Sequence, residues 1–355
     1  MDKFKIDSHK LIYHVGRLND WLKGKNIYPV YVEVSPCGSC NHRCTYCALD
    51  FMGYKAVFLD TKILKERLRE MGASGVKSIM YAGEGEPLLH RDIGDIISHT
   101  RKAGIDVAIT TNGVLLSREL ADSVLANVTW IKISINGATK TTYAKIHRAN
   151  PDDLDKVMKN MAYASKLKRQ KGYSCALGMQ LLLLPENYHE AVDLAKKAKD
   201  IGMDYLVVKP YSQHPFSKTE KYKNIKYSKY LYLADKLAVL NTNKFNVIFR
   251  INTMKKWDTG VPDYQHCYAL PFWTYLDSSG NVWSCSAYLS DQRFKTGNIY
   301  RNTFREIMSS ERRKKLLLWA KDKLDTAGCR VNCRMDEINR YLWSLRHPPE
   351  HVNFI

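Results

Sequence analysis

Three cysteines follow an apolar run and lie within one short segment, Cys40-Asn41-His42-Arg43-Cys44-Thr45-Tyr46-Cys47. Their C-x3-C-x2-C spacing can bring three sulfur atoms to one small metal centre, and soft thiolates select iron–sulfur clusters, zinc or Cu(I). Structural zinc sites are usually closed by four ligands and favour C-x2-C pairs. The spacing therefore favours an iron–sulfur cluster with an open coordination position, and structural zinc stays the alternative.

Apolar runs alternate with helix-like segments up to about residue 215. The predicted strands are 28–35, 76–82, 107–110, 130–135, 176–184 and 205–208. The predicted helices between them are 63–71, 93–103, 118–125, 153–168 and 189–199. This alternation predicts a parallel sheet with helices outside it. Six units are too few for the usual eightfold barrel, so we expect an α/β fold built on a partial (β/α)6 TIM-like barrel.

The composition limits the class of protein. The chain has 355 residues, 45 % of them hydrophobic and 26 % charged, as in a soluble globular protein. The first ten residues are charged, and no run reaches the roughly 18 apolar residues of a membrane span. Nine cysteines, an odd number with close pairs, suit metal ligation in a reducing compartment better than disulfides. We therefore expect a cytoplasmic protein without a membrane partner.

The formal net charge of +19 has two interpretations. Lysine-rich stretches such as 156–171, 196–199 and 218–229 suit solvated surfaces. Alternatively, the charge attracts an anionic small-molecule substrate. Nucleic acid is a weaker possibility because no arginine-rich arm or interleaved aromatic-basic module is present.

The cysteine triplet, with Tyr46 before its last member, resembles the cluster loop of the radical S-adenosylmethionine (SAM) superfamily. The resemblance implies that Cys40, Cys44 and Cys47 hold a [4Fe–4S] cluster whose open iron binds SAM, with Tyr46 beside the cofactor. In that family, reductive cleavage of SAM gives a 5′-deoxyadenosyl radical that abstracts a substrate hydrogen. The electron would come from a reduced flavodoxin or ferredoxin-type donor.

A glycine-rich segment, Gly83-Glu84-Gly85-Glu86-Pro87, follows the second predicted strand. Glycines at such a position let the backbone approach a ligand closely. The segment resembles the "GGEP" motif of the radical SAM family, with Glu84 in the place of the first glycine. The resemblance implies that its backbone receives the SAM ammonium group.

Other SAM contacts are predicted at the ends of later strands. Asn112 and Ser134 end the third and fourth strands, where the resemblance implies ribose contacts. The segment 143–148 is similar to the family's "Y-x-K-I-R" pattern, which implies that Arg148 pairs with the SAM carboxylate through its bidentate fork. An inserted histidine makes His147 the alternative. Lys209, at the end of the sixth strand, is the candidate catalytic residue, either as an anion ligand or as a proton acceptor.

A second cysteine set comprises Cys267, Cys285, Cys329 and Cys333. A predicted hairpin at 272–285 would bring Cys285 back towards Cys267, so the four thiols can close one site. Structural zinc is one interpretation, since four thiolates suit it. The C-x12-G-x4-C portion instead resembles the SPASM/twitch module of radical SAM enzymes such as aminocyclitol dehydrogenases. That resemblance implies a second, auxiliary [4Fe–4S] cluster in a small C-terminal α+β domain.

We therefore expect an N-terminal helical extension (1–25), the partial barrel (26–215), a connector (216–255) and the auxiliary-cluster domain (256–355). Cys37 and Cys175 are expected to be spare thiols. The predicted function is oxidation of a sugar or aminocyclitol-type molecule by hydrogen abstraction, with the auxiliary cluster as electron acceptor. Modification of a ribosomal peptide or of RNA is the alternative within the family. A zinc-stabilised nucleic-acid-binding module is the alternative from another class.

Overall fold

One curved sheet of ten strands organises this computed structural model, which describes residues 4–260 and 262–354. The strand order is β10-β9-β8-β1-β2-β3-β4-β5-β6-β7. Neighbours from β1 to β7 are parallel, β8 adds to β1 in parallel, and β9 and β10 are antiparallel. The strands are β1 (Tyr31–Val34), β2 (Ser78–Tyr81), β3 (Asp106–Thr111), β4 (Trp130–Ser134), β5 (Ala176–Leu182), β6 (Tyr205–Lys209), β7 (Asn246–Phe249), β8 (Trp273–Leu276), β9 (Asn281–Trp283) and β10 (Lys295–Asn298).

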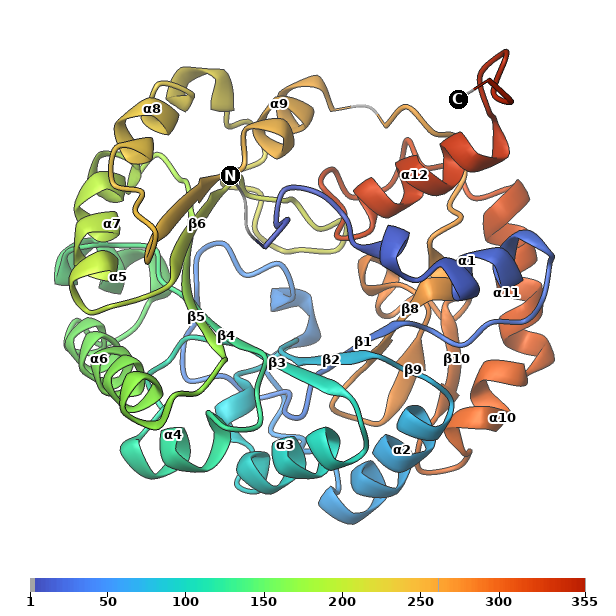
Figure 1. Cartoon of the computed structure of the whole chain (residues 1–355), viewed down its shortest axis with the longest axis horizontal. Helices are drawn as coiled ribbons and strands as arrows, with labels where there is room; N and C mark the ends of the chain where they lie inside the picture. Colours follow the sequence, from blue (N-terminus) through green and yellow to red (C-terminus); the bar gives the residue numbers. More distant parts are fainter. Residues whose placement is uncertain (1–3, 261, 355) are drawn as a thin grey trace.

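Helices cover the outer side of this curved sheet, so that the strands form an open ring around a central space (Figure 1). Helices α9 and α12 lie near the opening between the two sheet edges. The helices are α1 (Val15–Leu22), α2 (Thr61–Ala73), α3 (Ile93–Lys102), α4 (Arg118–Val124), α5 (Lys140–His147), α6 (Asp153–Lys171), α7 (Ala191–Asp200), α8 (Leu233–Ala238), α9 (Ile251–Thr259), α10 (Phe304–Ser309), α11 (Glu311–Asp322) and α12 (Asp336–Arg346).

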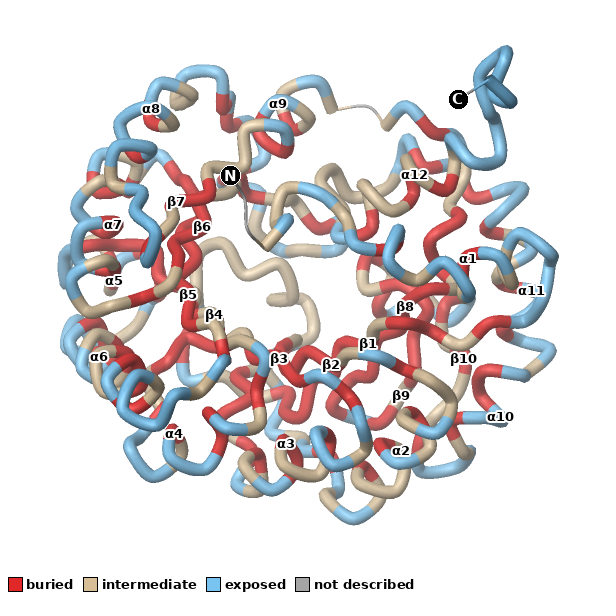
Figure 2. Tube along the Cα trace, in the orientation of Figure 1, coloured by how far each residue is buried: buried red, intermediate tan, exposed pale blue. Residues whose placement is uncertain are grey.

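The two faces of the sheet differ in polarity because successive side chains of a strand point to opposite faces. In β4, Ile131 and Ile133 are fully buried in the main core beneath the helices, whereas Lys132 and Ser134 alternate with them and are only half-buried. Strands run mostly buried through the ring in Figure 2, and the long loop inside it is half-buried. The sequence thus builds an apolar outer face and a polar inner face.

The predicted α/β class, with a TIM-like barrel and a C-terminal domain, is confirmed. The barrel extends one strand beyond the six predicted, because β7 pairs in parallel with β6. That strand lies in the segment expected to be a connector. The four residues of this strand, Asn246–Phe249, do not indicate in the sequence that it pairs with β6.

The C-terminal region shares the sheet with the barrel. Strand β8 continues it beside β1, with Tyr31 opposite Trp273 and Val34 opposite Leu276. The basic segment after β10 forms two helices, α10 and α11. Ser310 separates them because its side chain caps α11 by accepting a hydrogen bond from the Arg313 amide.

Within the segment expected to be a helical extension (1–25), the described residues from 4 onward are only partly helical. A short 3-10 turn (Leu11–Tyr13) precedes α1, and Phe4 and Ile6 pack against Tyr205 and Val207 of β6. Throughout the described residues, every helix is too short or too polar to cross a membrane.

Candidate active site and second cysteine centre

The first cysteine loop follows β1 and crosses to the end of α5. The amides of Arg43 and Thr45 donate hydrogen bonds to the carbonyls of His147 and Ile146, at 3.1 and 2.9 Å. These bonds fix the middle of the loop at the carboxyl ends of the parallel strands. Barrel enzymes place their chemistry at that end of the sheet.

The three thiols of this loop are partly buried and close enough to influence one another. Burial, with the charges of Glu86 and Cys47, raises the pKa of Cys40 to about 12. Burial, Cys47 and Cys40 also raise the pKa of Cys44. Converging thiolates repel one another unless a cation neutralises them. Three soft donors in one loop therefore fit the iron of an iron–sulfur cluster.

The segment Gly83–Pro87 packs directly against the cysteine loop. The Glu86 amide donates to the Ser39 carbonyl at 2.8 Å. A side chain at Gly85 would place its Cβ 2.3 Å from the carbonyl oxygens of both Cys37 and Ser39. Only glycine fits this approach, so Gly85 holds the two loops together.

The two glutamates of this segment are both anchored. Glu86 accepts hydrogen bonds from the Thr111 hydroxyl (2.5 Å) and the Asn112 amide (2.9 Å). Glu84, in the position of the expected glycine, accepts from the Ser278 amide at 2.7 Å. Its carboxylate thereby joins the loop after β2 to the turn between β8 and β9, a role that sequence reasoning missed.

Two of the predicted SAM contacts, Asn112 and Tyr46, lie at the first cysteine loop. The Asn112 amide nitrogen donates to the Asn41 side chain at 2.7 Å, and the Tyr46 hydroxyl lies 3.4 Å from His147 Nδ1. Ser134 ends β4, half-buried on the inner face. Their roles toward SAM stay predictions.

The structure separates the two alternatives at the end of α5. Arg148 is exposed in a left-handed C-cap with φ of 46°, while His147 is fully buried. His147 Nδ1 lies 3.4 Å from Cys44 Sγ, and its Nε2 accepts from the Asn136 amide at 3.1 Å. The exposed position disfavours the predicted contact of Arg148 with the SAM carboxylate. The inserted histidine, and not the arginine after it, faces the cysteine loop.

A second histidine, His42, was not identified from the sequence. It is buried and lies 3.3 Å from Asp153 Oδ2. Its ligand atom, that of His147 and Cys44 Sγ all lie within 4.8 Å of one another, which would suit one metal ion. His42 lies between Cys40 and Cys44 in the C-x3-C-x2-C motif, and this position in the sequence is the signal that could have identified it.

Glu190 anchors the helix that carries His147. Its carboxylate accepts hydrogen bonds from the Ala138 amide and from the amide and hydroxyl of Thr139, at 2.6, 3.2 and 2.8 Å, and from the Thr142 hydroxyl. Burial alone would raise the pKa of Glu190, but these donors lower it overall. The carboxylate therefore stabilises the start of α5 as an anion.

Replacement of Glu190 by glutamine is expected to lower the free energy of unfolding at neutral pH by about 1–3 kcal/mol. The reason is that the glutamine NH2 group would face N–H and O–H groups that now donate to the carboxylate. A lowered pKa means that the wild-type stabilisation is present above the unfolded-state pKa and disappears as the pH falls through the folded-state pKa. Denaturation at several acidic pH values should show a shallower pH dependence for Glu190→Gln. The exposed Glu350→Gln is the matched control, and equal curves for all three proteins would contradict the assignment.

The second cysteine set comes from three separate segments. Cys267 precedes β8, Cys285 follows β9, and Cys329 and Cys333 lie between α11 and α12. Asn339 of α12 holds the first segment, accepting from the Tyr268 amide at 2.6 Å.

These four thiols also converge. Burial, with Cys333 and Cys329, raises the pKa of Cys267 to about 12, and burial, Cys333 and Cys267 raise the pKa of Cys285. Four mutually interacting thiols fit a fully ligated metal centre.

Lys209 ends β6 and is half-buried on the inner face, like Lys132 of β4. Burial and then the charges of Lys132 and Arg250 lower the pKa of Lys209. Its predicted catalytic role stays a proposal.

Comparisons with known families identify both centres. A family model of the radical SAM superfamily matches residues 34–198, and one of the SPASM iron–sulfur cluster-binding domain matches residues 267–334. The chain is a radical SAM protein with a C-terminal SPASM domain. These domains imply a SAM-binding [4Fe–4S] cluster, SAM itself and an auxiliary cluster. The donor sets of the two loops fit both clusters, which favours iron–sulfur over the zinc-stabilised module.

Two curated relatives with the same name match part of the chain. The chain is 28 % identical over 197 residues to a GTP 3′,8-cyclase of Chlorobaculum tepidum, covering 54 % of the chain and 57 % of the relative. It is 34 % identical over 150 residues to a GTP 3′,8-cyclase of Clostridium acetobutylicum, covering 41 % and 45 %. The radical SAM protein thus spans about half the length of the curated relatives it matches.

Solved structures show the same fold at low identity. Streptococcus suis SuiB bound to its precursor peptide SuiA matches with a TM-score of 0.65 and 18 % identity, over 88 % of this chain and 70 % of SuiB. Native anSMEcpe with bound AdoMet matches with a TM-score of 0.60 and 20 % identity, over 90 % and 95 %.

Proposed function

We propose that this radical SAM protein is an oxidoreductase acting on a small molecule of the sugar or aminocyclitol type. The observation that carries the proposal is the position of the second cysteine centre. Arg334, directly after Cys333, reaches the inner face of the sheet, where Nη1 lies 2.9 Å from Glu33 Oε2. Glu33 belongs to β1, the strand that leads into the first cysteine loop. Both centres thus adjoin the same inner face, which suits a substrate held between them.

The overall change removes two hydrogen atoms from the substrate: one as a hydrogen atom, the other as a proton and an electron. When bound, SAM and the first cluster supply the radical that takes the hydrogen atom, and the auxiliary cluster takes the electron. Lys209 is the proposed proton acceptor, because its lowered pKa leaves a share of neutral amine at the inner face. A reduced flavodoxin or ferredoxin-type protein is the proposed electron donor.

A redox-neutral rearrangement of a nucleotide is the second candidate. It is favoured by the relatives named GTP 3′,8-cyclase, which align over 54 % and 41 % of the chain at 28 % and 34 % identity. The two candidates differ in the hydrogen count of the product. Oxidation lowers the mass by two hydrogen atoms, whereas cyclisation without loss of atoms leaves it unchanged.

The test uses anaerobically reconstituted protein, a chemical reductant, SAM, and sugars and aminocyclitols deuterated at their carbinol carbons. We expect deuterium in the released 5′-deoxyadenosine and a product lacking two hydrogens by mass spectrometry. A product of unchanged hydrogen count would overturn the oxidation. Failure of the whole panel to stimulate 5′-deoxyadenosine release would reject this substrate class.

A further inference from the structure

Five basic side chains gather at the inner face of the sheet. Two come from strands, one follows β7, and two come from the loop between α11 and α12; they are Lys132, Lys209, Arg250, Arg330 and Arg334. The charges of the other four all lower the pKa of Lys209, although burial contributes most. The Arg250 amide donates to the Val208 carbonyl at 2.9 Å, and Arg330 binds the Ser212 carbonyl, so both arginines lie beside the end of β6 that carries Lys209.

Two of the five have carboxylate partners. Arg334 Nη1 lies 2.9 Å from Glu33 Oε2 and donates to the Tyr31 hydroxyl at 2.6 Å. Arg250 Nε lies 3.0 Å from Asp7 Oδ1. Yet the Arg334 side chain keeps 43 % of its surface exposed, so its guanidinium is still accessible to a ligand.

The other three have no such partner. Arg330 donates to the hydroxyl and the carbonyl of Ser212, at 2.7 and 3.0 Å, both neutral acceptors. Across residues 4–260 and 262–354, neither Lys132 nor Lys209 forms an ion pair with a carboxylate, and Lys132 Nζ lies 5.3 Å from the centre of the Trp130 ring.

Five basic side chains face two carboxylates here, Glu33 and Asp7, and four of the five are cations when Lys209 is neutral. Like charges in a partly desolvated space destabilise the protein, and a multiply charged anion would relieve the repulsion. A single carboxylate would offset only one of the two excess charges that remain when Lys209 is neutral. A phosphoryl group carries about 1.5 to 2 negative charges at pH 7 and three acceptor oxygens. It matches both the bidentate forks of arginine and the point charges of lysine.

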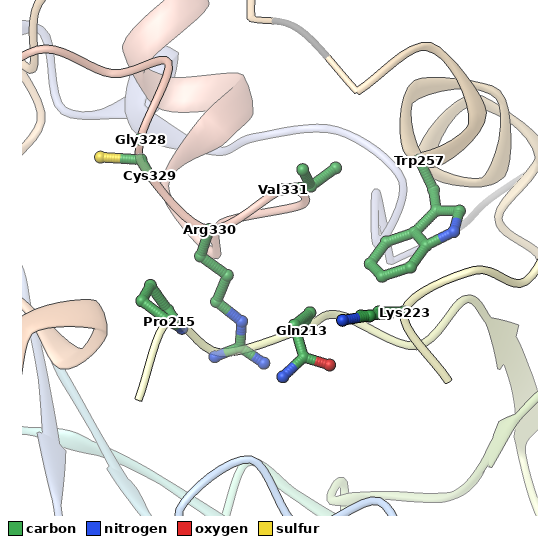
Figure 3. A pocket seen from close by; sticks show the side chains of 8 residues that line it. All are labelled: Gln213, Pro215, Lys223, Trp257, Gly328, Cys329, Arg330 and Val331. Atoms are coloured by element: carbon green, nitrogen blue, oxygen red, sulfur yellow. The ribbon is translucent and has the colours of Figure 1, made fainter. Parts of the chain in front are cut away.

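A cavity lies beside Arg330, which is the one of the five basic residues that lines it. It has a volume of about 280 Å³, and Gln213, Lys223 and Trp257 line it together with Cys329 (Figure 3). In this view the guanidinium of Arg330 points toward Gln213, away from the Cys329 thiol. Arg330 therefore stands between the second cysteine centre and the space where a ligand could lie.

We propose that the inner face around Lys132, Lys209 and the 330–334 loop binds the phosphoryl group of the substrate. This inference rests on the proposed function and narrows its substrate to phosphorylated or nucleotide-linked small molecules.

The test is calorimetric titration of the anaerobic, cluster-loaded protein with inorganic phosphate at low ionic strength. We expect saturable binding that weakens about tenfold or more in Lys132→Met and in Lys209→Met, the cost of one charge-assisted hydrogen bond. Methionine keeps the apolar stem, and thermal denaturation checks that each variant is folded. Lys244→Met, at an exposed position, is the matched control and should bind phosphate as the wild type does.

Absence of saturable phosphate binding by the wild type would overturn the inference, as would equal weakening in Lys244→Met. Release of 5′-deoxyadenosine by the same wild-type preparation is measured separately. Phosphate binding without SAM cleavage would leave the anion site standing and reject the radical chemistry. SAM cleavage without phosphate binding would reject the anion site and leave the radical chemistry standing.

Discussion

Replacement of Cys44 by alanine is expected to abolish release of 5′-deoxyadenosine from SAM. The thiol is one of the three predicted donors in the loop after β1, and its sulfur lies 3.4 Å from the buried His147. Removal of one donor leaves too few for a cluster with one open iron. We expect a loss of at least about 100-fold, since even outer partners of a metal site cost 10- to 100-fold. Chromatography of the anaerobic reaction, with iron and sulfide analysis, measures it.

Cys37→Ala is the matched control for this prediction. Cys37 is fully buried three residues before the first donor, and its sulfur accepts from the Ser39 amide at 3.2 Å. It is thus occupied by a local hydrogen bond, and we expect its replacement to leave SAM cleavage intact. Loss of the cluster in Cys37→Ala but not in Cys44→Ala would show that the iron is bound by other thiols than those predicted.

Replacement of Cys285 by alanine is expected to stop substrate turnover and to lower the iron content by about half, because only one of two four-iron clusters would be lost. Burial is the main cause that raises the pKa of its thiol, and the charges of Cys333, Cys267 and Cys329 raise it further. A closed four-thiolate centre cannot keep its ligand set after this change. Iron and sulfide analysis with electron paramagnetic resonance of the reduced protein reports which cluster remains.

Cys175→Ala provides the comparison for the second centre, since Cys175 is buried in the main core, apart from both cysteine sets. It should keep the full iron content. Residual 5′-deoxyadenosine release by Cys285→Ala reports on the first centre alone. Unchanged iron content in Cys285→Ala, or zinc in the wild-type C-terminal centre, would contradict an auxiliary iron–sulfur cluster.

Local patterns in the sequence were sufficient for the barrel strands. The alternation of Ile131 and Ile133 with Lys132 specifies both a strand and its two faces, and β4 forms where it was expected. The C-x3-C-x2-C loop was placed correctly because it follows β1 directly. These features depend on neighbours in the chain, which a single sequence displays.

Pairing between strands that are far apart in the chain could not be predicted from the sequence. Nothing in Trp273–Leu276 indicates that this strand pairs with β1, some 240 residues earlier, because register depends on tertiary contacts. The directions of the side chains at 147 and 148 could not be predicted from the sequence for a related reason: a left-handed C-cap at Arg148 turns the arginine outward and leaves His147 facing the cysteine loop. A short cap of this kind has no signature in the residue types present.

The position of β1 has a consequence for self-association. This strand is hydrogen-bonded on both sides, to β2 and to β8, although β8 belongs to the SPASM module. A chain ending before Cys267 would leave one side of β1 as a bare sheet edge next to the first cysteine loop. Unpaired edges are templates for strand addition between molecules. The SPASM module therefore shields the radical-generating half of the protein from aggregation, in addition to carrying its own cofactor.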